Sequence, residues 1–153
     1  MLLAIGMGIV GATKILYAGC GIQISSIGFR VISGHTMLAA AVWPMACLLI
    51  LHDGLNVRPA PALMLGLALA ATIAVARVLI DAHTVSEVIA GWIVGALVVA
   101  RLLQRWKDAP ILPPWLRPLA AGSVLLVSSI AYGHHAPIQA AIETYSPFLC
   151  SRL

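Results

Sequence analysis

Two short stretches of this sequence carry residues that could do chemistry in an otherwise apolar chain. The first is ARVLIDAHTVSE, residues 76–87, which holds Arg77, His83 and Glu87 after a run, residues 62–76, that has no charged residue. The four-residue spacing of His83 and Glu87 puts them on one face of a helix. A carboxylate that binds one imidazole nitrogen fixes the tautomer and leaves the other nitrogen free to attack. The stretch therefore offers an oriented nucleophile beside a cation.

The same residues also allow a purely structural interpretation. TVSE, Thr84–Glu87, matches a capping box, in which Thr84 caps a helix and Glu87 reaches back to the backbone. Arg77, at the end of an apolar run, can extend its aliphatic chain to reach the lipid head groups. Alternatively, its planar guanidinium can bind two phosphate oxygens at once. Spacing alone leaves both pairs of alternatives open.

The second stretch is SGHT, Ser33–Thr36, at the start of another apolar run. Ser33 is a favoured N-cap residue, and Gly34 lets a ligand approach the backbone closely. A helix N-terminus presents unpaired N–H groups and a partial positive charge, which suits a phosphate, and His35 lies in that first turn. Lys14, near the end of the first apolar run, adds a cation. An ordinary cap and a lysine that reaches for the head groups are the structural alternatives.

The composition indicates which elements must position these residues. The chain has 153 residues, of which 61% are hydrophobic and 9% charged, and its mean hydropathy is +1.03. A soluble domain carries roughly a quarter of its residues as charged types. The fold class expected is therefore all-α, a polytopic membrane helical bundle. The net charge of +4 is then no sign of nucleic-acid binding and is judged by where the basic residues fall between spans.

Apolar runs of near-spanning length predict about five transmembrane helices. Their approximate ranges are residues 1–17, 34–51, 60–80, 84–103 and 119–131. HDGLNVRPAP, between the second and third runs, is expected to be a tight turn, and the prolines of QRWKDAPILPPWLRP rule out a continuous helix after the fourth. Residues 1–131 are expected to form a transmembrane core, and residues 132–153 a polar or amphipathic tail.

The basic residues predict an orientation in the membrane. They concentrate between Arg101 and Arg117, beside the interfacial tryptophans Trp106 and Trp115. The positive-inside bias places this cluster in the cytoplasm. The residues that then gather at the opposite face are Lys14, Arg30, His35, Arg77, His83 and Glu87. Ionisable groups at membrane depth are costly and usually functional, although loop ends are also where charges reach water. We expect a site at the periplasmic rim of a bacterial inner membrane.

Taken together, these stretches resemble the type-2 phosphatidic acid phosphatase superfamily, which shares its site with vanadium haloperoxidases. The signature of that superfamily is K-x6-RP, then PSGH, then SR-x5-H-x3-D. Residues 76–87 keep both spacings of the third part, with alanine for serine and glutamate for aspartate, and ISGH, residues 32–35, matches the second. Of the first part only Lys14 has a match. Gly21 stands at the arginine position, and Arg30 could supply a cation from nearby.

The resemblance implies a membrane-embedded lipid phosphate or diphosphate phosphatase that works through a phosphohistidine, without a metal or other cofactor. His83 would attack phosphorus, Glu87 would orient it, and His35 would protonate the leaving oxygen. The phosphate-binding groups implied are Lys14, Arg77, Ser33, Gly34 and, by position, Arg30. The implied partners are the lipid bilayer and a lipid phosphate, namely phosphatidate, phosphatidylglycerophosphate, an isoprenyl diphosphate such as undecaprenyl diphosphate, or lipid A.

Other interpretations remain as alternatives. The glycine at position 21 suits a catalytically impaired scaffold protein that binds lipid phosphate. A transporter or channel component is less suitable, because the middles of the spans carry no charge. GHH, residues 133–135, lacks a third metal ligand at a useful spacing. The three cysteines form no metal motif, and a bridge between Cys20 and Cys150 requires that both face an oxidising compartment.

Overall fold

The structure, a computed structural model, describes residues 1–106 and the single positions 113, 115, 116, 119, 122, 123, 126, 142 and 144. The long helices of this part are α1 (Leu2–Cys20), α2 (Gly34–Cys47), α3 (Pro59–Leu79) and α4 (Val85–Trp106). A 3-10 turn, η1 (Ser25–Ile27), lies between α1 and α2. A short π-helix, η2 (Leu48–Gly54), continues α2.

The four helices confirm the expected fold class. Each has a stretch that is long and apolar enough to cross a membrane, so the protein is a multi-pass helical membrane protein. Between residues 1 and 106 there is no β-strand, only an isolated antiparallel bridge between Ile24 and Phe29. The fifth expected span, the tail and the GHH stretch lie outside the described residues, apart from the single positions given above.

Two helix ends differ from the expected ranges. α1 continues to Cys20 and ends at Gly21, whose φ of 65° is the left-handed conformation that glycine adopts readily at a helix C-terminus. The second span does not turn after Leu51 but remains helical through Gly54. His52 stabilises this extension, because its Nδ1 lies 2.8 Å from the carbonyl oxygen of Val57.

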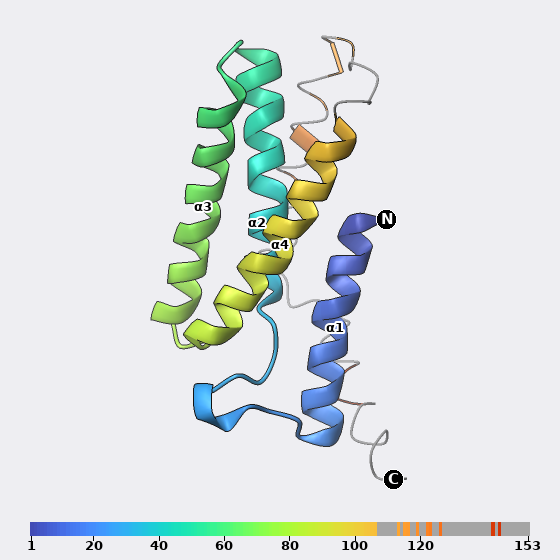
Figure 1. The fold of residues 1–153 in the computed structure, drawn as a ribbon, viewed down its shortest axis with the longest axis vertical. Helices are drawn as coiled ribbons and strands as arrows, with labels where there is room; N and C mark the ends of the chain where they lie inside the picture. Colours follow the sequence, from blue (N-terminus) through green and yellow to red (C-terminus); the bar gives the residue numbers. More distant parts are fainter. Residues whose placement is uncertain are drawn as a thin grey trace.

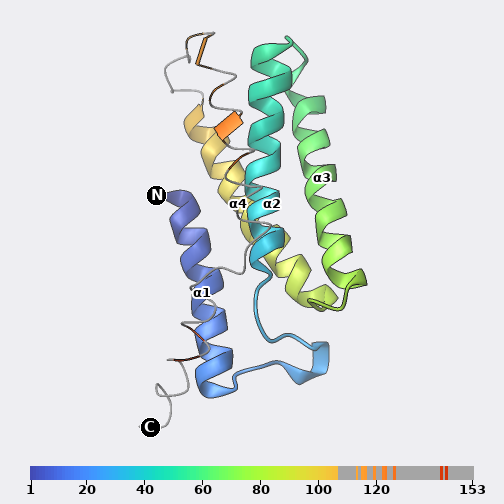
Figure 2. The ribbon, with the colours of Figure 1, turned by 180° about the vertical axis from the view of Figure 1, so that it is seen from behind.

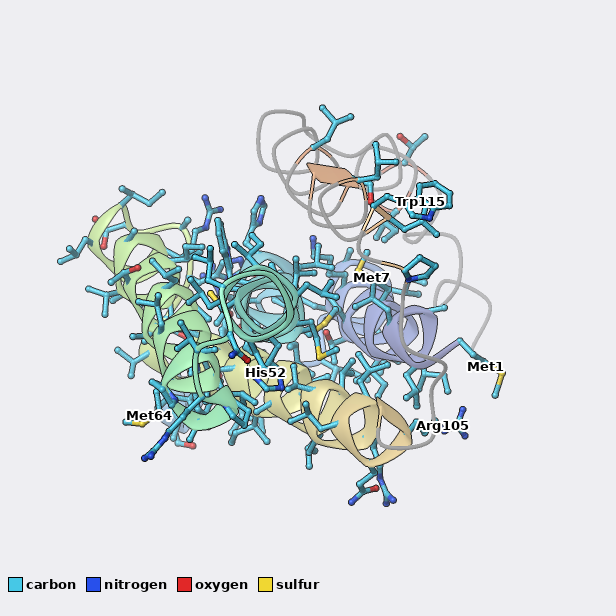
Figure 3. The ribbon with its side chains drawn as sticks, turned by 90° about the horizontal axis from the view of Figure 1, so that it is seen from above. Met1, Met7, His52, Met64, Arg105 and Trp115 are labelled. Carbon is cyan, nitrogen blue, oxygen red and sulfur yellow. The ribbon has the colours of Figure 1, made fainter. Side chains whose placement is uncertain are left out.

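The second helix is the centre of the bundle. Of its apolar span, 56% is buried, compared with 11% for α1. Seen along the bundle, α2 is surrounded by the other three helices, and Met64 of α3 points away from it (Figure 3). Met64 is 70% exposed, as expected of a side chain that faces lipid.

Glycines allow the helices around α2 to approach its backbone. A Cβ atom at Gly91 of α4 would lie 2.5 Å from the carbonyl oxygen of Ser33, and one at Gly66 of α3 would lie 2.3 Å from Cα of Pro44. Small residues are typical of contacts between transmembrane helices. Gly91 therefore determines how closely α4 approaches the SGH stretch.

Helix directions bring four chain segments to one end of the bundle. α1 and α3 finish there, and α2 and α4 begin there (Figures 1 and 2). α1 is shifted along the bundle, so that its last turn lies beyond the connection between α3 and α4. We call this end, with the α1–α2 and α3–α4 connections, the site end.

Candidate active site

The N-terminus of α4 carries the capping box expected from TVSE. Thr84 precedes the helix, and its backbone N–H donates to Oε2 of Glu87 at 3.2 Å. In return, the backbone N–H of Glu87 lies 3.5 Å from Oγ1 of Thr84. The structural interpretation of this stretch is therefore confirmed.

The same carboxylate also holds the histidine before the helix. His83 Nδ1 lies 2.8 Å from Oε2 of Glu87. The Glu87 side chain is fully buried, and that of His83 is 13% exposed. When Nδ1 carries the proton and donates it to Glu87, Nε2 has a lone pair and no proton. The capping and orienting interpretations are thus compatible, because one oxygen accepts from both donors.

The other oxygen of Glu87 binds the chain that leads into α2. Oε1 accepts from the backbone N–H groups of Arg30 at 3.0 Å and Val31 at 3.3 Å. The guanidinium Nε of Arg30 also donates to it at 3.3 Å. A buried carboxylate is costly unless donors surround it, and here both oxygens are bonded. Glu87 therefore joins two segments that lie 57 residues apart in the sequence.

The SGH stretch begins α2 as expected, but its serine does not form the expected cap. Ser33 occupies the N-cap position, yet its side chain makes no capping bond to the backbone. Instead, its hydroxyl lies 3.0 Å from that of Thr36, and both residues are fully buried. The backbone N–H of Ser33 donates to the carbonyl oxygen of Glu87 at 3.1 Å. Gly34 and the half-buried His35 follow in the first turn of α2.

Arg77 lies in the last turn of α3 and is linked to the histidine by the backbone. Its carbonyl oxygen accepts from the N–H groups of Ala82 at 3.1 Å and His83 at 3.3 Å. This tight connection brings the end of α3 close to the start of α4. The Nε atom of Arg77 is buried and has no hydrogen-bond partner within the part of the chain that is described. A buried donor without an acceptor costs about 1–3 kcal/mol, so an anionic ligand at this atom would be stabilised.

Lys14 lies on α1, beside a threonine that ties this helix to the site end. The hydroxyl of Thr13 accepts from the backbone N–H of Ile32 at 3.1 Å and donates to the carbonyl oxygen of Val10 at 2.8 Å. Lys14 itself is half-buried. The bond from Ile32 fixes α1 directly before the SGH stretch, so the lysine is held at the same end as the histidine pair.

All the expected site residues thus lie on segments that meet at the site end. Direct hydrogen bonds join four of them: His83, Glu87, Arg30 and Ser33. Lys14, His35 and Arg77 are brought to the same end by α1, α2 and α3 (Figure 1). The arrangement combines an oriented imidazole, guanidinium groups and a helix N-terminus, which together suit a phosphate group.

Several hydroxyl contacts that position the site were not expected from the sequence. Thr84 Oγ1 donates to the carbonyl oxygen of Gly28 at 3.0 Å, and Ser86 Oγ donates to that of Ile27 at 3.0 Å. Thr13 has the equivalent role on α1. A signal was available, because hydroxyls next to the charged residues of an apolar chain need hydrogen-bond partners. Their partners, however, are backbone atoms of distant loops, which the sequence does not reveal.

One known protein family matches the part of the chain that carries these residues. The family described as the PAP2 superfamily matches residues 14–111, which is more than half of the chain. The chain belongs to the PAP2 superfamily. This confirms the resemblance, and members of the superfamily are generally phosphatases. The match includes the site-end residues from Lys14 to Glu87.

The chain is also similar to a curated protein of unassigned function. A Klebsiella pneumoniae protein described as "Uncharacterized 22.5 kDa protein in cps region" is 38% identical over 111 residues. The aligned part covers 72% of this chain and 53% of the relative, so the chain spans about half the length of that protein. No solved structure matches the chain.

Proposed function

We propose that this PAP2 protein is a membrane-embedded phosphatase that removes phosphate from a lipid phosphate or diphosphate through a phosphohistidine. The observation that carries the proposal is the 2.8 Å contact between His83 Nδ1 and the buried Glu87 carboxylate. It leaves Nε2 as the reactive nitrogen of His83. The buried Nε of Arg77, on the adjoining turn, has no hydrogen-bond partner among the described residues, which supports an anionic substrate beside it.

The proposed reaction has two steps. His83 Nε2 forms a bond to phosphorus while the bond between phosphorus and the lipid oxygen breaks, and His35 gives a proton to that oxygen. Water then attacks the phosphohistidine and gives a proton to His35, and the P–N bond breaks. Phosphate leaves, and both imidazoles return to their starting state. Glu87 stabilises the positive charge on His83 throughout.

The phosphate oxygens are bound by cations and by backbone N–H groups. Arg77 and Lys14 offset the charge that builds up on the oxygens, and the N–H groups at Gly34 bind them at the start of α2. Ser33 contributes by its place in this turn, since its hydroxyl is buried against Thr36. These groups bind phosphate directly, so we propose that turnover needs no metal ion.

Arg30 fills part of the role of the arginine that is missing at Gly21. Its Nε is held by Glu87, which points the guanidinium toward the His83 pair, and 43% of its side chain is exposed. A guanidinium group has more than one edge that donates hydrogen bonds, so one edge can bind one anion while another edge binds a second anion. The alternative is a scaffold protein that binds lipid phosphate without turnover. The glycine at position 21, where the superfamily has an arginine, favours that alternative.

We place the protein in a bacterial inner membrane with the site end facing the periplasm. Arg58, Arg101 and Arg105 lie at the other end of the bundle, where α3 begins and α4 finishes. Basic residues are enriched on the cytoplasmic side of membrane proteins. The substrate is then a lipid whose phosphate lies at the outer face of that membrane, and the candidates are phosphatidate, phosphatidylglycerophosphate, undecaprenyl diphosphate and lipid A.

Phosphate release by the purified protein tests the function. In detergent, the protein is expected to release phosphate from one of these lipids in the presence of a chelator, and His83→Ala is expected to abolish release because it removes the nucleophile. His52→Ala, a histidine at the opposite end of the bundle, serves as the matched control, with folding checked by gel filtration. If His83→Ala released phosphate at the rate of the unaltered protein, His83 would not be the nucleophile. Substrate binding without release by the unaltered protein would favour the scaffold.

A further inference from the structure

Three isoleucines on the connection between α1 and α2 are exposed although they lie outside the spanning helices. Ile22, Ile24 and Ile27 are 56%, 52% and 57% exposed, respectively. We call residues 21–29 the isoleucine loop. Exposed apolar groups on a helix that crosses a membrane face lipid, but on a connecting loop they mark an interaction surface.

The isoleucine loop is held in place, so the exposure of its side chains is part of the fold. Ile24 and Phe29 exchange two backbone hydrogen bonds, of 2.8 and 3.1 Å. Phe29 packs against the core cluster around Met37. The hydroxyls of Thr84 and Ser86 hold the loop backbone at Gly28 and Ile27. The isoleucines therefore remain outward while the backbone is fixed to the start of α4.

The position of the isoleucine loop indicates a membrane as its partner. The loop follows α1, which is long and apolar enough to cross a membrane and is shifted toward the site end (Figures 1 and 2). From the end of α1 the chain crosses the site end to η1, which lies beyond the connection between α3 and α4 (Figures 1 and 2). Lys14 and Arg30 lie at the same end, and cations beside an apolar surface suit anionic lipid head groups.

We propose that the isoleucine loop inserts into the head-group layer and holds the apolar chain of the substrate while the phosphate reaches His83. This inference rests on the proposed phosphatase function and assigns the contact with the lipid chain to the isoleucine loop. The link to His83 is short, because Thr84, which directly follows it, and Ser86, in the first turn of α4, both hold the loop. A lipid chain at the loop is therefore presented to the imidazole.

A double variant, Ile24→Asn with Ile27→Asn, tests the loop with two substrates. One is a long-chain phosphatidate in vesicles, and the other is p-nitrophenyl phosphate in solution. We expect the apparent KM for the vesicle lipid to rise about tenfold, because two apolar side chains no longer enter the membrane. The kcat/KM for p-nitrophenyl phosphate should stay unchanged. Leu55→Asn, a 67% exposed apolar residue at the opposite end, is the matched control and should alter neither value.

The two substrates separate the possible outcomes. An equal loss on both would mean that the loop only supports the site, and no change on either would mean that it has no role; each result overturns the proposal. If the unaltered protein turns over neither compound, the phosphatase function fails, and the loop is judged by a second measurement. A photo-crosslinking residue at position 27 of the His83→Ala protein, in liposomes, should form lipid adducts. A lack of such adducts, or adducts with another protein instead, would also reject the membrane as partner.

Discussion

Glu87 differs from the aspartate of its superfamily by one methylene group, and its two oxygens contact two segments of the chain. One oxygen reaches His83 and Thr84 on its own helix. The other oxygen reaches Arg30 and Val31, which lie in the connection between α1 and α2. Because the carboxylate bridges two segments, the glutamate holds both His83 and the chain that leads into the SGH stretch.

This bridging leads to a prediction for Glu87→Asp. Although the change restores the superfamily residue, the shorter side chain cannot keep all its contacts with His83, Arg30 and Val31. We expect kcat to fall about 10- to 100-fold, as a shift of about 1 Å in a catalytic group does. Glu87→Gln keeps the length and loses the charge, and should reduce kcat at least as much. Steady-state kinetics on the preferred lipid give both values. A kcat for Glu87→Asp at or above that of the unaltered protein would show that the bridge to residues 30 and 31 is not needed.

At the scale of the helices, the contact between α2 and α4 sets the geometry of the site. Gly91 lies one turn after Glu87 and faces the carbonyl oxygen of Ser33. Gly95, one turn further, faces the carbonyl oxygen of Met37, which a Cβ atom would approach to 2.4 Å. Two glycines on one face of α4 therefore bring its backbone against the start of α2, so that the carboxylate and the SGH stretch are adjacent.

Two glycine substitutions, one on α4 and one on α1, are expected to have opposite effects on stability. Gly91→Ala places a Cβ atom 2.5 Å from a backbone oxygen, so the helices must separate, which should cost about 1–3 kcal/mol of stability and reduce activity. A Cβ atom at Gly11 of α1 meets no atom of the described residues within 4 Å, so Gly11→Ala should stabilise its helix by up to about 1 kcal/mol. Thermal unfolding in detergent compares them. A Gly91→Ala protein that melts as high as Gly11→Ala would contradict the close contact.

At the scale of the whole molecule, the helix bundle carries a group of basic residues at each end. The site end carries Lys14, Arg30 and Arg77 with the two histidines of the proposed mechanism. Arg58, Arg101 and Arg105 lie at the other end. Such a division suits a protein that binds an anionic group at one membrane face and is oriented by basic residues at the other.

The orientation can be tested by labelling single cysteines in intact cells. Gln23→Cys and Gln104→Cys replace exposed residues at opposite ends of the bundle. A membrane-impermeant maleimide should label Gln23→Cys above the level of the unaltered protein and Gln104→Cys only after lysis, because in the proposed orientation only position 23 faces the periplasm. The reverse pattern would place the site end in the cytoplasm.

The sequence by itself determined the elements and the pairing of residues within one helix turn. The spans were predictable because a membrane requires runs of about 20 apolar residues, and α3 and α4 begin and end within three residues of the expected ranges. His83 and Glu87 were expected to share a face because the helix repeat places residues four apart together. The superfamily was likewise evident from three short stretches.

Only the tertiary structure decided what the carboxylate, the serine and the first connection do. Glu87 binds Arg30 and Val31, and Ser33 is buried against Thr36 instead of capping its helix. The isoleucines of the first connection are exposed at the site end. The periodicity of a helix depends only on neighbouring residues. These contacts depend instead on how a loop packs against a helix that lies 57 residues further along the chain.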